Sequence, residues 1–168
     1  EFGSKHTLIV YEDIPDVIED KNTIEENAKK KAEECYEVFK SPIISDDSGL
    51  FVDALDGQPG VHSKRYAGFS STDVENNQKL INELKTADNL SAFFKTVLCY
   101  FDGLNFIISE GVLEGNIVSE PRGKNGFGYD PIFEVSGKTL GEMTLDEKSN
   151  ISHRKLAAVE LVGKLNEI

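Results

Sequence analysis

The chain has 168 residues, of which 39% are hydrophobic, enough for one buried core and too few for two ordinary domains. Its formal net charge of −12 argues against unspecific nucleic-acid binding, because basic side chains drive that binding. No run approaches the roughly 18 apolar residues of a membrane span, and the first residues have no signal-peptide pattern. We therefore expect a single domain that binds neither nucleic acid nor membranes.

Two features concern the cellular setting and the start of the chain. Cys35 and Cys99 lie in apolar patterns, so we expect small core residues rather than a disulfide, which fits a reducing, cytoplasmic location. Residues 1–4, Glu-Phe-Gly-Ser, could be cloning residues or a native loop.

The N-terminal third predicts a strand, a helix and a second strand. Leu8–Tyr11 is strand-like, and an acidic loop follows it. A Thr23-x-x-Glu26 capping box and apolar residues at helical spacing predict a helix over about 24–40. Residues 42–45 then predict a buried strand that ends abruptly at the sequence Asp-Asp-Ser-Gly.

The rest of the chain predicts two more capped segments around a hairpin. A Thr72-x-x-Glu75 box begins a helix expected to turn Val74, Ile81 and Leu84 towards the core. Runs at 92–101 and 104–109 flank Asp-Gly, which suits a two-residue hairpin turn. Residues 120–130 are irregular, 144–147 form a third capping box, and 155–165 are amphipathic. This order predicts an α/β domain with a mixed, twisted sheet flanked by helices.

Asp46, Asp47 and Ser48 directly follow the predicted strand, where α/β proteins tend to bind ligands. One carboxylate could hold Mg²⁺ while its neighbour orients or deprotonates water, since Mg²⁺ prefers hard oxygen ligands. The alternative is an ordinary turn, for which Asp, Ser and Gly are common residues.

Three polar residues of the first helix are also open to two interpretations. Glu26 could be a further metal ligand, but it also completes the capping box. Asn27 and Lys31 interrupt the apolar stripe, so they either sit at its rim or have a polar partner.

The segment 121–130 places three glycines around two aromatic rings and a carboxylate, Phe127, Tyr129 and Asp130. Glycine permits close approach of a ligand to the backbone, and the rings offer faces for stacking. The alternative is a loop whose rings fill the core. Lys148 and the sequence Ser152-His153-Arg154 bring cationic and donor groups to a junction of two helices, either as an anion site or as a solvated face.

Several of these segments occur in the order found in the Ham1-type nucleoside-triphosphate pyrophosphatases, which the chain resembles over nearly its whole length. They are Ser-Asp-Asp-Ser-Gly-Leu at 45–50, Gly-x-Pro-Gly-Val at 57–61, Arg-Tyr at 65–66, Asn-Gly-Phe-Gly-Tyr-Asp-Pro at 125–131 and Ser-His-Arg at 152–154. The resemblance implies a Ham1/Maf-like architecture and hydrolysis of inosine- and xanthosine-type triphosphates to a monophosphate and pyrophosphate.

The resemblance also implies roles for individual residues. Asp47 would be the catalytic carboxylate that positions or deprotonates water. Mg²⁺ would be held by Glu26, Asp46 and Asp47. A purine nucleoside triphosphate would be bound by Ser48, Phe127, Gly128, Tyr129, Asp130, Lys148, His153 and Arg154.

The chain departs from the family pattern at its N-terminus, where a strand leads into a Ser/Thr-x-Asn-x-x-Lys motif that grips the triphosphate. That motif is not found in the 168 residues. We therefore expect an N-terminally incomplete pyrophosphatase domain, a homodimer by resemblance. The alternative is a non-catalytic nucleotide-binding or dimerisation module.

Overall fold

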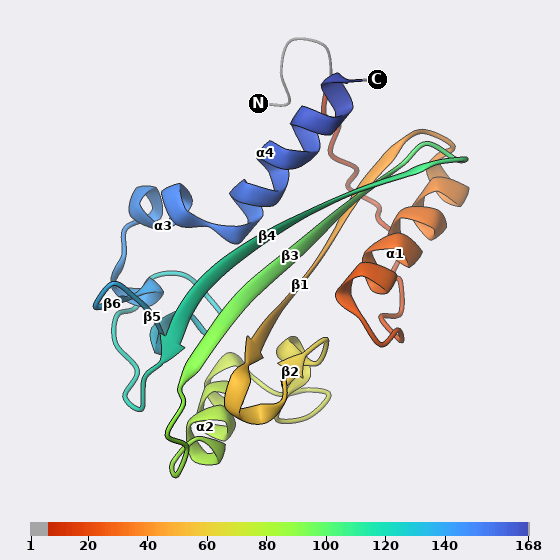
Figure 1. The fold of residues 1–168 in the computed structure, drawn as a ribbon. Coiled ribbons are helices and arrows are strands. Elements are labelled where there is room, and N and C mark those ends of the chain that lie inside the picture. The colour runs from red at the N-terminus through yellow and green to blue at the C-terminus, as the bar shows by residue number, and fades with distance from the viewer. Residues whose placement is uncertain (1–6, 168) are drawn as a thin grey trace.

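The computed structural model describes residues 7–167, so the origin of positions 1–4 lies outside the described part. A six-stranded sheet in the order β2-β1-β3-β4-β5-β6 forms its centre (Figure 1). Three long strands are flanked by three short ones. The strands are β1 (Ile43–Val52), β2 (Pro59–Gly60), β3 (Ser91–Phe101), β4 (Phe106–Ile117), β5 (Phe133–Val135) and β6 (Lys138–Thr139).

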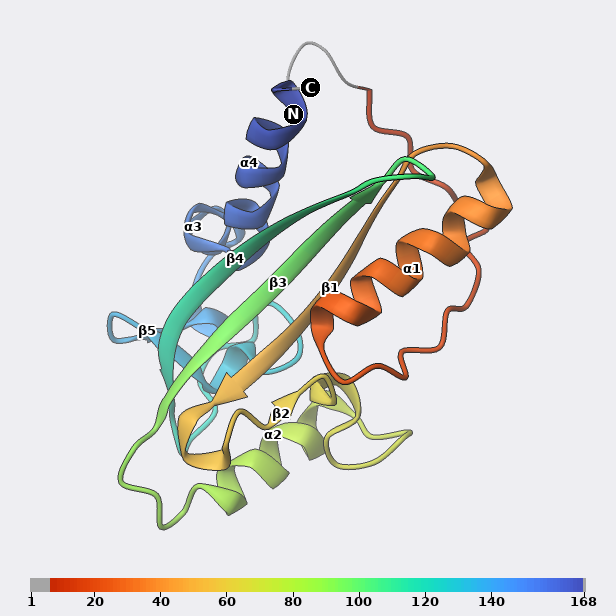
Figure 2. The same ribbon diagram turned by 45° about the vertical axis from the view of Figure 1, so that its right-hand side comes forward.

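Every strand pair among residues 7–167 is antiparallel. The α/β class is confirmed, but the expected mixed sheet is wrong for this part of the chain. The chain leaves β1 and enters β3 at the same end of the sheet, where α2 (Asp73–Glu83) lies (Figure 2). Strand β3 therefore has to run back along β1, and the following hairpin reverses the direction again.

Helices cover both faces of the sheet (Figure 2). Helix α1 (Ile24–Phe39) packs on β1 and β3, while α4 (His153–Asn166) packs on β4 and β3. The short α3 (Leu145–Ile151) precedes α4. No helix within residues 7–167 is long and apolar enough to cross a membrane.

The three predicted capping boxes are confirmed, and each marks the start of a helix. Both reciprocal hydrogen bonds are present at Thr23, Thr72 and Thr144. The first predicted helix ends within one residue of expectation, with Lys40 in the left-handed region at φ 51°. In α2 the orientation is only partly as expected: Leu84 is buried, whereas Val74 is exposed. The buried residues of α2 are Asn76, Asn77 and Leu80, so the inward face begins at Asn76, and Val74 lies in the exposed first turn of the helix.

The predicted hairpin is confirmed as β3–β4, but its loop is longer than two residues. Phe101 pairs with Phe106, so residues 102–105 form the connection. The Asp102 carboxylate explains this loop, because its Oδ1 accepts the backbone N–H groups of Leu104 at 2.8 Å and Asn105 at 2.7 Å. The strand-like run Leu8–Tyr11, in contrast, belongs to no strand.

Strand β1 differs most from expectation. It does not end at Asp46 but continues to Val52, pairing Asp46 with Leu98 and Asp47 with Val97. Because successive side chains of a strand point to opposite faces, Asp46 and Asp47 lie on opposite sides of the sheet. The two carboxylates therefore belong to different environments.

Helix α4 lies unusually close to β4, because the contact residue on the strand is Gly111. A Cβ atom at this position would lie 1.9 Å from the backbone oxygen of His153 and 2.6 Å from the backbone nitrogen of Ala157. Any larger residue would force α4 away from the sheet.

We expect Gly111→Ala to lower the free energy of unfolding by about 1–3 kcal/mol or more, because overpacking must displace α4. Urea unfolding followed by circular dichroism measures the change. Gly163→Ala is the matched control, since no atom lies within 4 Å of a Cβ there. That substitution should stabilise the helix slightly, and equal losses in both variants would contradict the close approach at Gly111.

Candidate functional site

Strand β1 brings Asp46, Asp47 and Ser48 to the two faces of the sheet. On the α1 face, the Lys31 ammonium lies 2.6 Å from Glu19 Oε1 and 3.2 Å from Asp47 Oδ1. It also donates to the backbone oxygen of Asp46 at 2.9 Å. Lys31 therefore has polar partners instead of lying at the rim of the helix stripe.

Burial alters the ionisation of this cluster. It raises the pKa of Asp47, as does the negative charge of Glu19, while the Lys31 ammonium opposes the shift. For Lys31, burial lowers the pKa, but the hydrogen bond to Glu19 and the charge of Asp47 outweigh it, so the pKa is raised overall. Asp47 is thus a carboxylate of increased basicity beside a firmly charged cation.

Asn27 is buried next to this cluster, at 1% exposure. Its Oδ1 accepts the Lys21 backbone N–H at 3.0 Å, but its Nδ2 has no hydrogen-bond partner among residues 7–167. A buried donor without a partner is costly. The neighbouring Asp47 carboxylate is the acceptor at hand, since Asn27 helps to lower the pKa of that group.

Glu19 was not identified from the sequence. It lies in the acidic N-terminal loop, where neighbouring carboxylates such as Asp16 and Asp20 have the same residue type and similar surroundings in sequence. Arg65 fixes it by donating from NH2 to the Glu19 backbone oxygen at 2.9 Å. Only the tertiary contact with Arg65 and Lys31 distinguishes it.

The three carboxylates expected to hold metal are not brought together. Glu26 Oε2 accepts from the Thr23 backbone N–H at 3.2 Å and from its hydroxyl at 3.0 Å, as the capping alternative requires. Asp46 is exposed on the opposite face from Asp47, 3.7 Å from Arg154 Nε. Within residues 7–167 no group of three or more His, Cys, Asp or Glu side chains is placed to hold a metal ion.

On the α4 face, an exposed aromatic ring lies beside two cations. The Phe127 side chain is 63% exposed. Lys148 Nζ is 4.6 Å and Arg154 Cζ 5.9 Å from the ring centroid. Ser48 also faces this side, where its hydroxyl is 2.6 Å from that of Thr96.

Asp130 and Tyr129 support the loop from inside. Asp130 is buried, accepts the Phe127 backbone N–H at 2.9 Å and forms an ion pair with Lys148. The buried Tyr129 ring packs in the core and its hydroxyl donates to the backbone oxygen of Ser63 at 2.7 Å. Of the two rings in the segment, Tyr129 therefore fills the core and Phe127 is available for stacking.

His153 begins α4 and is buried against the sheet. Its ring stacks on Phe94, with centroids 5.1 Å apart and planes 9° apart. Burial lowers its pKa to about 4, assisted by the charges of Arg154 and Lys148. His153 Nδ1 has no partner among residues 7–167, so the ring is a neutral group with a free polar atom.

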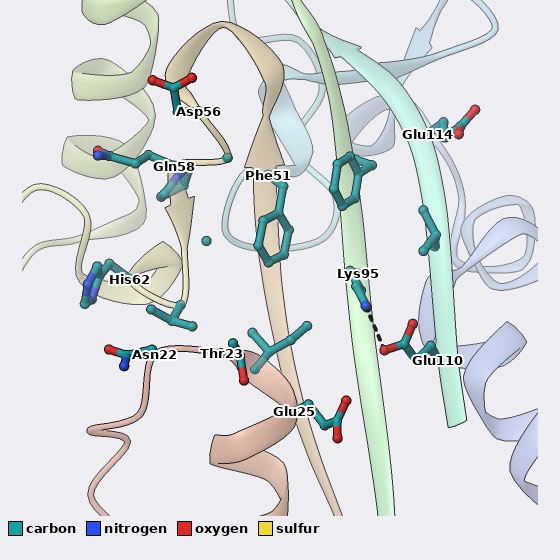
Figure 3. Close-up of a pocket in the computed structure, with 17 residues that line it drawn as sticks. Asn22, Thr23, Glu25, Phe51, Asp56, Gln58, His62, Lys95, Glu110 and Glu114 are labelled. Carbon is teal, nitrogen blue, oxygen red and sulfur yellow. Dashed lines mark ion pairs between the residues drawn. The ribbon is translucent and has the colours of Figure 1, made fainter. Parts of the chain in front are cut away.

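A recess of about 800 Å³ lies elsewhere on the α1 face, beyond the start of α1 (Figure 3). Phe51, Lys95 and Glu110 line its floor, and Gln58 and His62 lie along one wall (Figure 3). None of the site residues expected from the sequence lines this recess.

Known proteins resemble this chain over most of its length. The model of the Ham1 family matches residues 3–164. The dITP/XTP pyrophosphatase of Caldanaerobacter subterraneus subsp. tengcongensis is 49% identical, covering 87% of this chain and 76% of that protein. The dITP/XTP pyrophosphatase of Geobacter sulfurreducens is 47% identical, covering 97% of this chain and 86% of that protein.

Solved structures show the same fold. A HAM1 protein from Coxiella burnetii superimposes with a TM-score of 0.87 at 43% identity, covering 92% of this chain and 82% of the other. The Ham1 protein of Staphylococcus aureus also gives a TM-score of 0.87, at 39% identity, covering 90% of this chain and 81% of the other.

We expect His153 to stay neutral well below pH 6. Its pKa falls from 6.5 to about 4 on folding, so its contribution to stability is complete above pH 6.5 and is lost as the pH falls towards 4. The free energy of unfolding should fall by about 3 kcal/mol over this pH range. Urea unfolding at several pH values, compared between the parent and His153→Phe, measures this component. An unchanged pH slope in the variant would show that His153 does not contribute it.

Proposed function

This chain belongs to the Ham1 family, and from that premise we propose that it hydrolyses non-standard purine nucleoside triphosphates such as ITP, dITP and XTP. The products are the nucleoside monophosphate and pyrophosphate. The observation that carries the proposal is an exposed ring, Phe127, beside two cations on one face of the sheet together with a buried carboxylate, Asp47, on the other face. The relatives named dITP/XTP pyrophosphatases support the choice of substrate.

Phe127 and its neighbouring cations are suited to a 6-oxo purine. The exposed ring can stack on the base, and Arg154 and Lys148 supply hydrogen-bond donors beside it. Inosine and xanthosine carry an oxygen acceptor where adenine has an amino donor. Adenine would leave such a donor unpaired, which disfavours ATP.

On the other face of β1, Asp47 is suited to accept a proton from water. The oxygen of that water forms a bond to the α-phosphorus, while the bond from the α-phosphorus to the bridging oxygen breaks and pyrophosphate leaves. The proton of the water passes to the Asp47 carboxylate, whose raised pKa makes it a better base. Lys31 holds this carboxylate in place through its ammonium group.

We also propose that the reaction depends on Mg²⁺. Asp47 and Glu19 fit such an ion, because both already share one cation, Lys31, and Mg²⁺ commonly takes one or two carboxylates together with substrate phosphates. When bound, Mg²⁺ would neutralise phosphate charge and polarise the reacting phosphorus. Glu26 is engaged in the Thr23 cap, and Asp46 lies beside Arg154 on the opposite face of the sheet, so neither is placed to join Asp47 and Glu19.

A non-catalytic nucleotide-binding module is the second candidate. Turnover separates the two candidates, since binding without hydrolysis is the expectation of the module. The two buried free thiols, Cys35 and Cys99, are consistent with the cytoplasmic location proposed for either.

We further propose a homodimer formed through the sheet face that α1 leaves uncovered. This face carries Phe51 (Figure 3). Phe51 stacks on Phe93 with ring centroids 5.1 Å apart, and the exposed Val112 lines the same recess. It also carries charges of both signs, Lys95 and Glu110, paired at 2.7 Å. A two-fold axis places such a face against itself, so apolar surface meets apolar surface and each charge can meet its opposite.

With Mg²⁺ present, the chain should release pyrophosphate from ITP, dITP and XTP and much more slowly from ATP and GTP. Removing the metal with a chelator should abolish the release. Asp47→Asn should lower kcat for ITP by at least about a hundredfold, because the amide cannot accept the proton. Nucleotide affinity, measured by calorimetry, should be retained.

Asp53→Asn is the matched control, since it neutralises an exposed carboxylate just beyond β1 and should leave kcat unchanged. Equal turnover of all five nucleotides, or none, would refute the proposed activity. Full turnover by Asp47→Asn would refute the role of Asp47.

Val112→Asp should convert the dimer to a monomer, because a charge would be buried in the apolar contact. Light scattering coupled to size-exclusion chromatography measures the change as a loss of half the mass, to 18.6 kDa. Val159→Asp alters an exposed valine on α4 and should leave the dimer intact. A monomeric parent protein, or a dimer that persists in Val112→Asp, would exclude this surface.

A further inference from the structure

We propose that Asp73 and Asn77, in the first turns of α2, are positioning residues that hold Phe127 in place for the base and thereby set substrate selectivity. This inference rests on the proposed function. The Asp73 carboxylate accepts the backbone N–H of Gly128 at 2.7 Å, and Asn77 Nδ2 donates to the backbone oxygen of the same residue at 3.1 Å. Both peptide groups of Gly128 are therefore held by one helix.

The spacing of the two side chains makes this possible. Asp73 and Asn77 are four residues apart, so they lie one above the other on the same side of α2. Gly128 presents its N–H and C=O to them with a left-handed φ of 61°, and no atom lies within 4 Å of a Cβ built there. Gly128 is therefore not a glycine for want of space. The contacts to α2 stabilise its left-handed backbone conformation.

The neighbouring residues of the loop are also fixed. Tyr129 is anchored through its hydroxyl to Ser63, and the Phe127 backbone N–H is held by Asp130. The Phe127 side chain remains exposed, with Lys148 over its ring. Because the backbone on both sides of Gly128 is tied down, the direction in which the ring points depends on the Gly128 peptide groups.

Helix α2 does not need Asp73 to begin. Its N-terminus is capped by Thr72, whose hydroxyl accepts the Glu75 N–H, and Glu75 returns the bond to Thr72. Asn76 performs a separate task, since its Oδ1 accepts the backbone N–H of Ala67 at 2.7 Å. The carboxylate of Asp73 is thus committed to the aromatic loop, and the effect of losing it can be separated from that of weakening the helix.

The test uses three variants of the full chain. Asp73→Ala removes the acceptor for the Gly128 N–H, whereas Asp73→Asn retains an amide oxygen that can accept it. Thr72→Ala weakens the same helix start without touching Gly128. We expect Asp73→Ala to raise KM for ITP by about five- to tenfold, the effect of losing one hydrogen bond, with kcat nearly unchanged.

The preference for ITP over ATP, compared as kcat/KM, should fall in Asp73→Ala, because a less fixed ring discriminates less between bases. Asp73→Asn should restore both KM and preference. Thr72→Ala should leave both at the parent values. Equal changes in Asp73→Ala and Thr72→Ala, or no change in Asp73→Ala, would overturn the proposal.

A second measurement is independent of turnover. The chain contains no Trp, so Phe127→Trp introduces a single indole whose fluorescence anisotropy reports the mobility of the loop. In that background, Asp73→Ala should lower the anisotropy, while Asp73→Asn and Thr72→Ala should not. Absent ITP hydrolysis by the parent would refute the proposed function alone, and an anisotropy unchanged by Asp73→Ala would refute the positioning role.

Discussion

Side chains along a β-strand point alternately to the two faces of the sheet, and strand β1 applies this rule to adjacent carboxylates. Asp47 faces α1 and meets Lys31, whereas Asp46 faces α4 and meets Arg154. A turn at this place would have allowed both carboxylates to converge on one ion. The strand instead separates them, so that β1 supplies one carboxylate of raised pKa to the α1 face and a second carboxylate to the cations of the α4 face.

The α1 face concentrates charge that would be unfavourable if it were not paired. Lys31 is shared by Glu19 and Asp47, and Arg65 holds the segment that carries Glu19. On the α4 face, Asp130 fixes both Lys148 and the Phe127 backbone, while His153 stays neutral through burial. Fixed donors and a neutral imidazole beside an exposed ring are a preorganised environment for a polar base, and preorganisation is what allows hydrogen bonds to discriminate.

Predictions from short sequence motifs were reliable where the interaction behind the motif joins residues that are close in sequence. Each predicted Thr-x-x-Glu capping box is formed, because its two hydrogen bonds join residues three apart. The hairpin was also predicted, although the side chain of Asp102 lengthened its loop. Predictions that needed long-range pairing were less accurate: strand direction, the extent of β1 and the orientation of Val74 all depend on segments that only the folded chain brings near.

The residues of the chain by themselves determined the α/β class, the start of each capped helix and the resemblance to Ham1 proteins, because those rest on composition, periodicity and short motifs. Tertiary structure alone decided that Glu19 joins Asp47 at Lys31, that Asp46 meets Arg154 away from Asp47, and that Tyr129 is buried while Phe127 is open. The physical reason is common to all three. A carboxylate or a ring has the same chemistry in any sequence context, and its role follows from the partners and the burial that distant segments provide.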